Sequence, residues 1–293
     1  MRRHRPAPAG DGMRRLVQRV RRLPVSLLLG GLLTALVVGA ALLSLVWTPF
    51  PAEQVRVVAR LRPPGPVHWL GTDHFGRDVL SMILVGARNS LAVGAAAVAL
   101  GAVLGVPLGL AASAWGRWGD EAVARLGDLL FAFPAVLTAI LLTAALGAGA
   151  VNVVLALGLF NAAVFARVAR GAALAVWRRD FVRAALALGR GPLSVTLVHV
   201  LPNIAGVVIV QGTVLFAVAV LNEAALSYLG LGIQPPSPSW GKMLGDAQTF
   251  LFTSPLQAIF PGAAIALTVL GLNLLGDGLR DALDPRHRSA GLL

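Results

Sequence analysis

The residues best suited to chemistry lie together in one short segment, 68–78. Four of them are of metal-binding types: His68, Asp73, His74 and Asp78. Their spacing matches no recognised ligand pattern. The same residue types also build tight, glycine-rich turns, in which aspartate side chains accept hydrogen bonds from backbone N–H groups. We therefore predict a structural turn without a metal ion, with Asp78 capping an interfacial helix over 79–91. Metal binding remains the alternative for this segment.

The other common catalytic arrangements are missing from the sequence. The chain has no cysteine, which excludes a thiolate metal site and a cysteine nucleophile. No phosphate-binding loop of the form G-x-x-x-x-G-K-[ST] occurs, because the segment 241–243 lacks both the spacing and the hydroxyl. The patterns H-E-x-x-H and G-x-S-x-G are also absent. We predict that the chain is not an enzyme, holds no cofactor and does not hydrolyse ATP by itself, so an intramembrane enzyme is a remote alternative.

The composition places these residues in a membrane protein. Apolar residues make up 57% of the 293 residues and charged residues only 13%, whereas soluble domains average about 25% charged residues. Six stretches poor in charge are each long enough to cross a bilayer. They lie near 25–46, 89–116, 129–146, 151–170, 204–226 and 257–276. The sequence therefore predicts an all-α, polytopic protein with six transmembrane helices.

The arginines predict the orientation of these helices. The net charge is +12, and 19 of the 25 Lys and Arg residues fall in segments that share a side with the N-terminus. Positive residues favour the cytoplasmic side, so we predict that both termini are cytoplasmic. The first apolar stretch is too long for a signal peptide and is expected to be retained as a helix. Membrane loops also explain the basic charge without nucleic acid, which we do not expect as a partner.

The segment 167–202 has the signals of two short helices. Asp180 is a candidate N-cap, and Gly189 is well placed to end the helix that follows. Pro192 can begin a second helix, and Leu201-Pro202 is expected to end it before the fifth span. Two interpretations of this segment remain open: a docking surface for a soluble partner, and a solvated connection between spans.

The segment after the fifth span carries further polar and conformationally special residues. Glu223 lies at the end of the span, where it is either functional or simply exposed to water. Gly230 and Gly232 follow in a Leu-Gly repeat. A proline-rich turn then leads to Trp240, whose indole we expect at the depth of the lipid headgroups.

These segments together resemble a known family, the C-type permeases of peptide/nickel ABC importers, such as dipeptide and oligopeptide systems. The family's outer motif LGTDxxGRDxxS matches residues 70–81. Further matches lie at 223–232, 235–241 and 273–286, and the similarity covers nearly all of the chain from about residue 65. The resemblance implies a type I ABC importer permease fold with a cytoplasmic coupling helix. It also implies a second homologous permease, two ABC ATPase subunits, an extracytoplasmic solute-binding protein and a peptide substrate.

The resemblance assigns roles to individual residues. The ATPase-coupling loop would comprise Asp180, Phe181, Arg183, Ala184, Ala185, Leu188, Gly189, Leu201 and Pro202. The extracytoplasmic motif would comprise Gly71, Thr72, Asp73, Gly76, Arg77 and Asp78, and the outer gate Glu223, Gly230, Gly232 and Trp240. The family's coupling motif begins with Glu, but this chain has Arg183. With Asp180 as N-cap, Glu at this position would complete a capping box. An arginine here places a positive charge at the positive end of the helix dipole, at a cost of about 0.3–1 kcal/mol. The charge reversal suggests a matching change in the ATPase or weaker coupling.

The predicted spans divide the chain into segments. We predict a basic cytoplasmic tail at 1–22, a first helix at 23–47, an extracytoplasmic loop at 48–90, a five-helix core at 91–276 that includes the coupling loop 171–202, and a cytoplasmic tail at 277–293. A permease for nickel or another small solute is one alternative. A stand-alone channel or secondary transporter is an alternative of another class, and a structural scaffold is a third.

Overall fold

A computed structural model describes residues 24–132 and 134–283 of the chain. Helices and loops account for these two ranges, apart from one isolated bridge between Thr72 and Asp78. The predicted basic tail at 1–22 and the end of the C-terminal motif, 284–286, lie outside the described residues.

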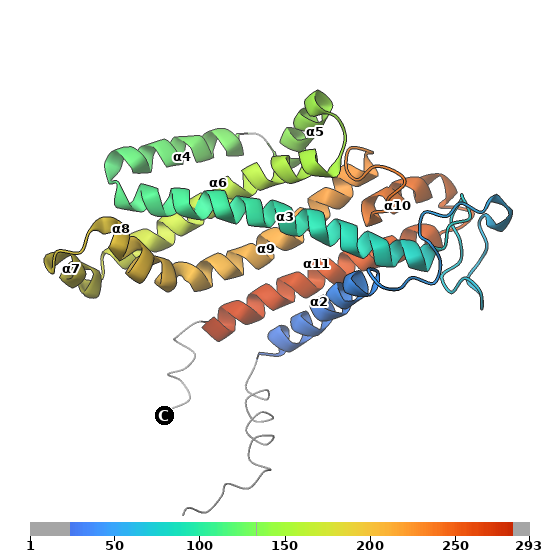
Figure 1. Cartoon of the computed structure of the whole chain (residues 1–293), viewed down its shortest axis with the longest axis horizontal. Helices are drawn as coiled ribbons and strands as arrows, with labels where there is room; N and C mark the ends of the chain where they lie inside the picture. The colour runs from blue at the N-terminus through green and yellow to red at the C-terminus, as the bar shows by residue number, and fades with distance from the viewer. Residues whose placement is uncertain (1–23, 133, 284–293) are drawn as a thin grey trace, which may run out of the picture.

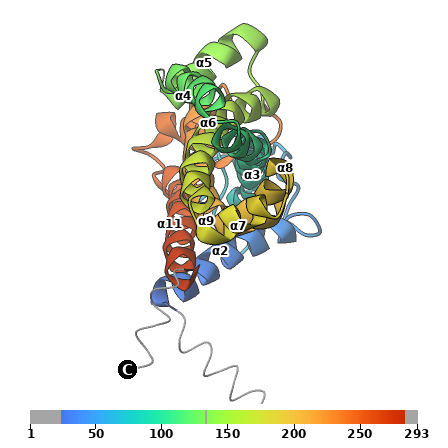
Figure 2. The ribbon, with the colours of Figure 1, turned by 90° about the vertical axis from the view of Figure 1, so that its left-hand side faces the viewer.

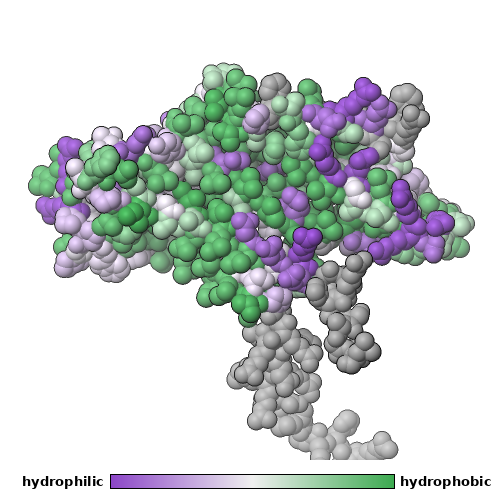
Figure 3. Space-filling model, turned by 180° about the vertical axis from the view of Figure 1, so that it is seen from behind, coloured by the Kyte–Doolittle hydropathy of each residue, from purple (hydrophilic) through white to green (hydrophobic). Residues whose placement is uncertain are grey.

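Within the described residues, five helices are long and apolar enough to cross a membrane. They are α2 (Val25–Leu43), α3 (Val79–Ala114), α6 (Ala150–Trp177), α9 (Leu201–Tyr228) and α11 (Leu256–Leu283). They run roughly side by side along the long axis of the molecule (Figure 1). A broad hydrophobic surface covers the middle of the bundle when it is seen from behind (Figure 3). Such a surface is typical of a chain that contacts lipid or another subunit, because soluble proteins rarely expose apolar patches above a few hundred Å².

The third predicted span differs from the other five. Instead of one long helix, the chain forms α4 (Arg117–Phe131) and the shorter apolar helix α5 (Ala135–Leu146), which has 12 residues. Pro134 stands at the N-cap of α5 with an extended backbone. Proline supplies no backbone N–H and clashes with a preceding helical turn, so the helix breaks at this position.

Two other boundaries also differ from the sequence prediction. The expected interfacial helix 79–91 is not separate, because α3 continues through it for 36 residues. No glycine or proline interrupts the junction in a way that would stop the helix. Similarly, α6 runs past residue 170 to Trp177. Its extension places Arg167 well inside a helix rather than at the edge of a loop.

Small residues allow α3 and α6 to pack closely. Gly101, Gly105 and Gly109 form a stripe on α3 at helical spacing. A Cβ at Gly105 would overlap the carbonyl oxygen of Ala162 on α6. Close backbone approach through small residues is typical of helix pairs in membranes, where van der Waals packing is the main attraction.

The short elements lie at the two ends of the bundle. One end holds α7 (Asp180–Ala187), α8 (Pro192–Val195) and the π-helical turn Thr196–Val200 that leads into α9. The other end holds α10 (Trp240–Ala247), the 3₁₀ turns Val57–Ala59 and Gln248–Phe250, and the long segment before α3. We call these the hairpin end (residues 178–203) and the loop end (residues 48–78 and 229–255). Figure 1 shows them at opposite extremes, and Figure 2 views the hairpin end directly.

Candidate functional site

Asp73 organises the turn at the loop end. Its Oδ1 accepts hydrogen bonds from the backbone N–H groups of Phe75 and Arg77, at 2.9 and 2.8 Å. Its Oδ2 accepts from Nε of Arg77 at 2.6 Å. Arg77 also lies 3.6 Å from Asp246 of α10, and Asp246 pairs with Lys242 at 3.0 Å. Asp73 therefore holds the turn closed and links it, through Arg77, to the opposite side of the loop end.

Asp78 caps the start of α3 and binds His68. It is the N-cap of α3, as predicted, and its Oδ2 accepts from the backbone N–H of Ser81 at 2.8 Å. The other carboxylate oxygen lies 2.9 Å from Nδ1 of the buried His68. Thr72 contributes a further tie, because its hydroxyl donates to the carbonyl of Ala59 and accepts from the N–H of Arg62. Both predicted turn aspartates therefore bind protein groups.

Two glycines of the motif are required by the backbone. Gly71 and Gly76 have φ values of 77° and 76°, a region that other residues adopt at a cost of about 1–2 kcal/mol. A Cβ at Gly76 would also overlap the carbonyl oxygen of Arg56. The spacing of the motif thus follows from the two sharp reversals that the turn makes.

The four candidate metal-binding side chains of segment 68–78 do not meet at one point. Within the described ranges, no group of three His, Cys, Asp or Glu side chains is placed to hold a metal ion. His74 instead stacks on the ring of Phe250, with centroids 5.3 Å apart. Burial lowers the pKa of His74, although Asp73 and Asp246 act in the opposite direction. His74 therefore tends to be neutral at the loop end.

Glu223 is fully buried near the end of α9, so the water-exposed interpretation is wrong. Its Oε1 accepts from the hydroxyl of Ser227 at 2.6 Å. Ser90 of α3 and Ser239, the N-cap of α10, also lie beside this carboxyl group and are fully buried. Three elements therefore meet at one acidic side chain. The serines of α3 and α10 were missed by the sequence interpretation, because nothing in the sequence places them next to Glu223.

The glycines after Glu223 allow the chain to turn tightly. Gly230 has a φ of 81° directly after α9. A Cβ at Gly232 would overlap the hydroxyl of Ser227, which would displace the group that binds Glu223. The Leu-Gly repeat thus brings the chain back against the end of α9.

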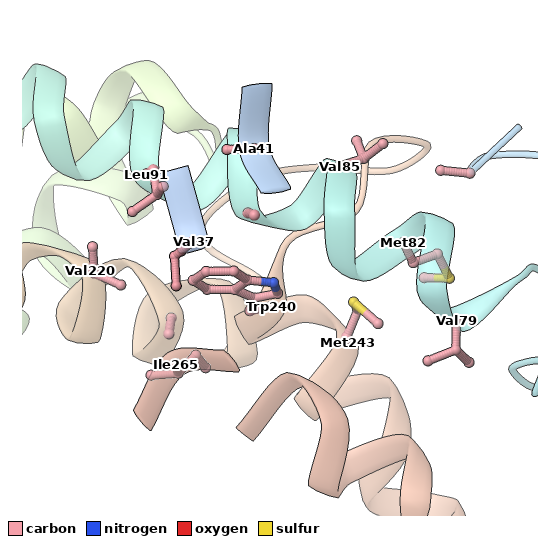
Figure 4. Packing of buried hydrophobic residues seen from close by; sticks show 13 residues of the cluster. Val37, Ala41, Val79, Met82, Val85, Leu91, Val220, Trp240, Met243 and Ile265 are labelled. Carbon is pink, nitrogen blue, oxygen red and sulfur yellow. The ribbon is translucent and has the colours of Figure 1, made fainter. Parts of the chain in front are cut away.

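The indole of Trp240 is buried inside the protein and is not exposed at its surface, where the sequence analysis expected it to meet lipid headgroups. Its side chain is only 1% exposed and lies beside Val37 in a buried cluster that also includes Val85 and Met243 (Figure 4). Its indole Nε1 donates to the carbonyl oxygen of Ile83 at 3.1 Å. The proline-rich turn folds the indole inward instead of toward solvent, so Trp240 joins α10 to α3.

At the hairpin end, α7 has one buried and one exposed face. Val182 and Ala185 pack into a buried cluster with residues of α3, α6, α8 and α9. The opposite face exposes apolar side chains, and Leu188, just after the helix, is 86% exposed. Phe181 and Ala184 belong to this exposed face. An exposed amphipathic helix of this kind is suited to docking in a groove.

The ends of α7 agree only partly with the sequence prediction. The helix ends as expected, because Gly189 has a φ of 82° and its N–H bonds to the carbonyl of Leu186. It begins differently, because Arg179 is the N-cap and Asp180 is the first helical residue without a capping hydrogen bond. Arg183 is therefore not in the capping-box position. It pairs with Asp180 at 3.2 Å instead, which offsets its unfavourable place near the start of the helix.

Leu201 and Pro202 do not end a helix. The chain is helical from Pro192 to Tyr228, with a π turn at Thr196–Val200 immediately before them. Here the N–H of Leu201 bonds to the carbonyl of Thr196, five residues back. The wider π turn gives room for the ring of Pro202, which has no N–H to donate.

One ion pair joins α4 to α6 and was also missed. Nη2 of Arg167 on α6 lies 2.9 Å from Oδ1 of Asp128 on α4. The guanidinium group also lies over the ring of Phe131, 4.3 Å from its centroid. The sequence interpretation placed both charged residues at the edges of spans, where a pair between them could not be foreseen.

Comparison with curated proteins finds close relatives. The chain is 44% identical over 230 residues to the dipeptide transport system permease protein DppC of Alkalihalophilus pseudofirmus, covering 78% of this chain and 76% of the relative. It is 41% identical over 260 residues to the glutathione transport system permease protein GsiD of Pectobacterium atrosepticum, covering 88% and 86%. The corresponding protein of Salmonella typhimurium is 42% identical over 270 residues, covering 92% and 89%.

A solved structure shares the fold. A chain of the MetNI methionine ABC transporter, in an inward-facing conformation, superimposes with a TM-score of 0.55 at 17% identity. The match covers 68% of this chain and 94% of that chain. The predicted fold, an ABC importer permease built from membrane helices, is therefore confirmed. Residues 101–289 match the family described as binding-protein-dependent transport system inner membrane component, and the chain belongs to this family of transport permeases.

Proposed function

We propose that this chain is one of two homologous permease subunits of an importer for short peptides. The names of its relatives, dipeptide and glutathione transport permeases, support this substrate class, and glutathione is itself a tripeptide. Two ABC ATPases would bind on the cytoplasmic side, and a solute-binding protein would deliver the peptide on the other. Transport would follow alternating access, in which the permease breaks no covalent bond of its substrate.

The observation that carries the proposal is the exposed face of α7. Phe181, Leu186 and Leu188 present apolar surface at the hairpin end, next to Arg183. Apolar side chains at an exposed helix gain free energy when a partner covers them, by about 25 cal/mol for each Å² removed from water. We infer that this face, together with the connection 188–191, docks in the ATPase. The hairpin end and both termini would then be cytoplasmic, in agreement with the arginine distribution.

The loop end would receive the binding protein. Its turn is fixed by Asp73 and Asp78, and a cleft of about 240 Å³ lies between this turn and the segment 235–238. Rigid, charged surfaces guide the approach of a partner and fix its orientation. Glu223 and Trp240 would hold α3, α9 and α10 together beneath this docking surface, as parts of the outer gate.

The docking proposal can be tested with one exposed residue. In the purified complex, Leu188→Glu should abolish co-isolation with the ATPase, because it places a charge in the apolar contact without disturbing the buried core. Val58→Glu is the matched control, since Val58 is 92% exposed at the opposite end. Retention of the ATPase by the Leu188 variant would refute the docking site.

The substrate class needs a separate experiment. Vesicles containing the permease pair, both ATPases and the binding protein should accumulate a labelled dipeptide only when ATP is present. Nickel uptake without peptide uptake would favour the small-solute alternative. Flux through the purified chain alone, without ATPases, would favour the channel or secondary transporter.

A further inference from the structure

A cleft of about 240 Å³ lies at the loop end, and its two walls differ in chemistry. One wall is the segment 235–238, in which three prolines have fixed φ angles and offer no N–H group. The other wall is ionisable and comes from the turn and from α10: it includes His74, Arg77, Lys242 and Asp246. Sites for whole small molecules usually measure about 300–1,000 Å³. The smaller volume of this cleft favours a single protruding side chain as its ligand.

The ionisable wall has unused hydrogen-bonding capacity. Among the described residues, Nδ1 of His74 has no hydrogen-bond partner although it is buried. In the same part of the chain, Nη2 of Arg77 lacks a hydrogen bond of good geometry, and its ion-pair contacts are 2.6 Å to Asp73 and 3.6 Å to Asp246. Lys242 has three donors, of which its pair with Asp246 at 3.0 Å needs one, and its side chain is 31% exposed. Since arginine and lysine only donate, a ligand that brings acceptors would complete this wall.

The charges of the wall indicate which acceptor fits. In the free chain, the carboxylates of Asp73 and Asp246 balance the cations of Arg77 and Lys242. Hydrogen bonds from cations are strongest to an ionised acceptor, so a carboxylate is the preferred ligand. Its entry adds one negative charge, however, and the wall then needs one further positive charge to stay balanced.

His74 can provide this positive charge. Burial lowers the pKa of His74, and the nearby Arg77 and Arg60 also lower it. Asp73 and Asp246 raise this pKa. A third carboxylate in the cleft would act in the same direction as these two aspartates and favour the protonated ring. His74 would thus be neutral while the cleft is free and positive while a carboxylate occupies it.

We propose that this cleft receives an aspartate or glutamate side chain of the solute-binding protein, and that His74 takes up a proton when that side chain enters. The inference rests on the proposed function, in which the binding protein docks at the loop end, and it names the chemistry of the contact. The carboxylate would bind Lys242 and Arg77, and the proline wall would hold the opposite side in place. A wall that is already rigid loses little freedom when the partner binds.

The first experiment measures binding of the dipeptide-loaded binding protein to the assembled transporter in lipid nanodiscs. Lys242→Gln should raise Kd about tenfold or more, because the carboxylate loses a charged hydrogen bond. Arg62→Gln is the matched control: it also removes one positive charge from the loop end, but Arg62 is exposed and does not line the cleft. This control should change Kd less than about threefold, as expected of a screened charge outside the contact. Equal increases in the two variants would overturn the proposal.

A second variant separates binding from local stability. Asp246→Asn removes the carboxylate that competes for Lys242 and Arg77, so binding should tighten, with a Kd at least about threefold lower. If these charges only held the turn against α10, Asp246→Asn would weaken binding as Lys242→Gln does. Weaker binding in both variants would therefore refute the carboxylate contact.

The uptake of a proton predicts a dependence on pH. Binding to the wild-type transporter should tighten by at least about threefold as the pH falls from about 7.5 to about 5.5, and by no more than about tenfold per pH unit, the limit for one proton. The variant His74→Gln should lack this component, and the difference between the two proteins excludes any titration on the binding protein itself. The same pH dependence in both proteins would refute the role of His74.

A blocked peptide identifies the source of the carboxylate. When the binding protein is loaded with a C-amidated dipeptide, Lys242→Gln should weaken its binding as much as before. Loss of the effect would mean that the cleft takes the carboxyl end of the peptide, which would overturn the proposal. If the wild-type transporter did not bind the loaded binding protein at all, the proposed importer itself would fail. Normal binding that is unchanged by Lys242→Gln would refute only the role of the cleft.

Discussion

Replacing Asp73 by Asn should loosen the loop end while leaving the helices intact. Asn keeps one oxygen for the N–H groups of Phe75 and Arg77, but its amide group opposes the guanidinium of Arg77 where a carboxylate now lies at 2.6 Å. Arg77 is only 11% exposed, and its other partner, Asp246, is 3.6 Å away. Breaking a buried pair on one side costs about 3–5 kcal/mol. We expect the lower end, about 3 kcal/mol, because Asp246 still compensates in part.

Hydrogen exchange measures this local change directly. The N–H groups of Leu61 and Thr72 bond across the loop to Asp73 and Arg62, both at 3.0 Å, and exchange when the turn opens. A cost of about 3 kcal/mol corresponds to roughly hundredfold faster exchange at these two amides. Asp246→Asn is the matched control and should change their exchange less than about fivefold, as expected for a long, partly exposed pair. If the two variants exchanged equally fast, Asp73 would not be the residue that closes the turn.

Three further changes test the loop end. Gly76→Ala should destabilise the turn by about 2 kcal/mol or more, seen as faster proteolysis, because its φ is positive and Arg56 blocks a Cβ. Trp240→Ala should cost about 3–5 kcal/mol in thermal unfolding of the purified complex, whereas the half-exposed Trp47→Ala should cost little. Burial lowers the pKa of His74 from its ordinary 6.5, so as the pH falls the unfolded turn binds a proton before the folded turn does. The stability of the turn should therefore decrease as the pH drops below about 6.5. The variant His74→Gln should not show this decrease.

The sequence predicted most of the membrane helices because their signal is simple. A charge-poor run of about 20 residues has few structural alternatives in a bilayer. The prediction failed where local geometry overrides composition, at Pro134, which breaks the third span, and at Pro202, which the π turn accommodates. Hydropathy does not distinguish these two prolines. Their outcomes depend on whether the preceding turn can widen while staying packed against neighbouring helices.

The candidate site was predictable only in its local parts. The caps and turns of Asp78 and Gly189 depend on neighbouring residues and were predicted correctly. The contacts of Glu223 with Ser90, and of Arg167 with Asp128, join residues far apart in the chain. Such pairs depend on how two helices rotate against each other, and a single sequence does not specify that rotation. Trp240 was misplaced for the same reason, since its proline-rich surroundings are equally compatible with an outward indole.

One continuous helix, which we call the rod, connects the two ends of the molecule. The helix from Pro192 to Tyr228 has 37 residues, or about 55 Å at about 1.5 Å per residue. This helix would bend most easily at the π turn, and bending there would stop a movement at one end from reaching the other. However, Val200 in this turn and Val195 and Ile204 on either side of it are at most 1% exposed and pack with α3, α6 and α7. Bending there would open this cluster and expose apolar surface to water, which is unfavourable.

It follows that α7 and α9 should move as one body. In the proposed mechanism, a push on α7 by the ATPase would therefore reach Glu223 and its serines as a rotation of the whole rod, without a hinge in between. The cluster at Glu223 would pass that rotation to α3 and α10, because both contribute a buried serine beside its carboxyl group. Weakening the π turn, by Val200→Gly, should uncouple the two ends, because it removes a buried side chain and makes the backbone more flexible. ATP hydrolysis should then continue while peptide uptake falls. If uptake and hydrolysis fell together, the rod would not be what joins the hairpin end to the loop end.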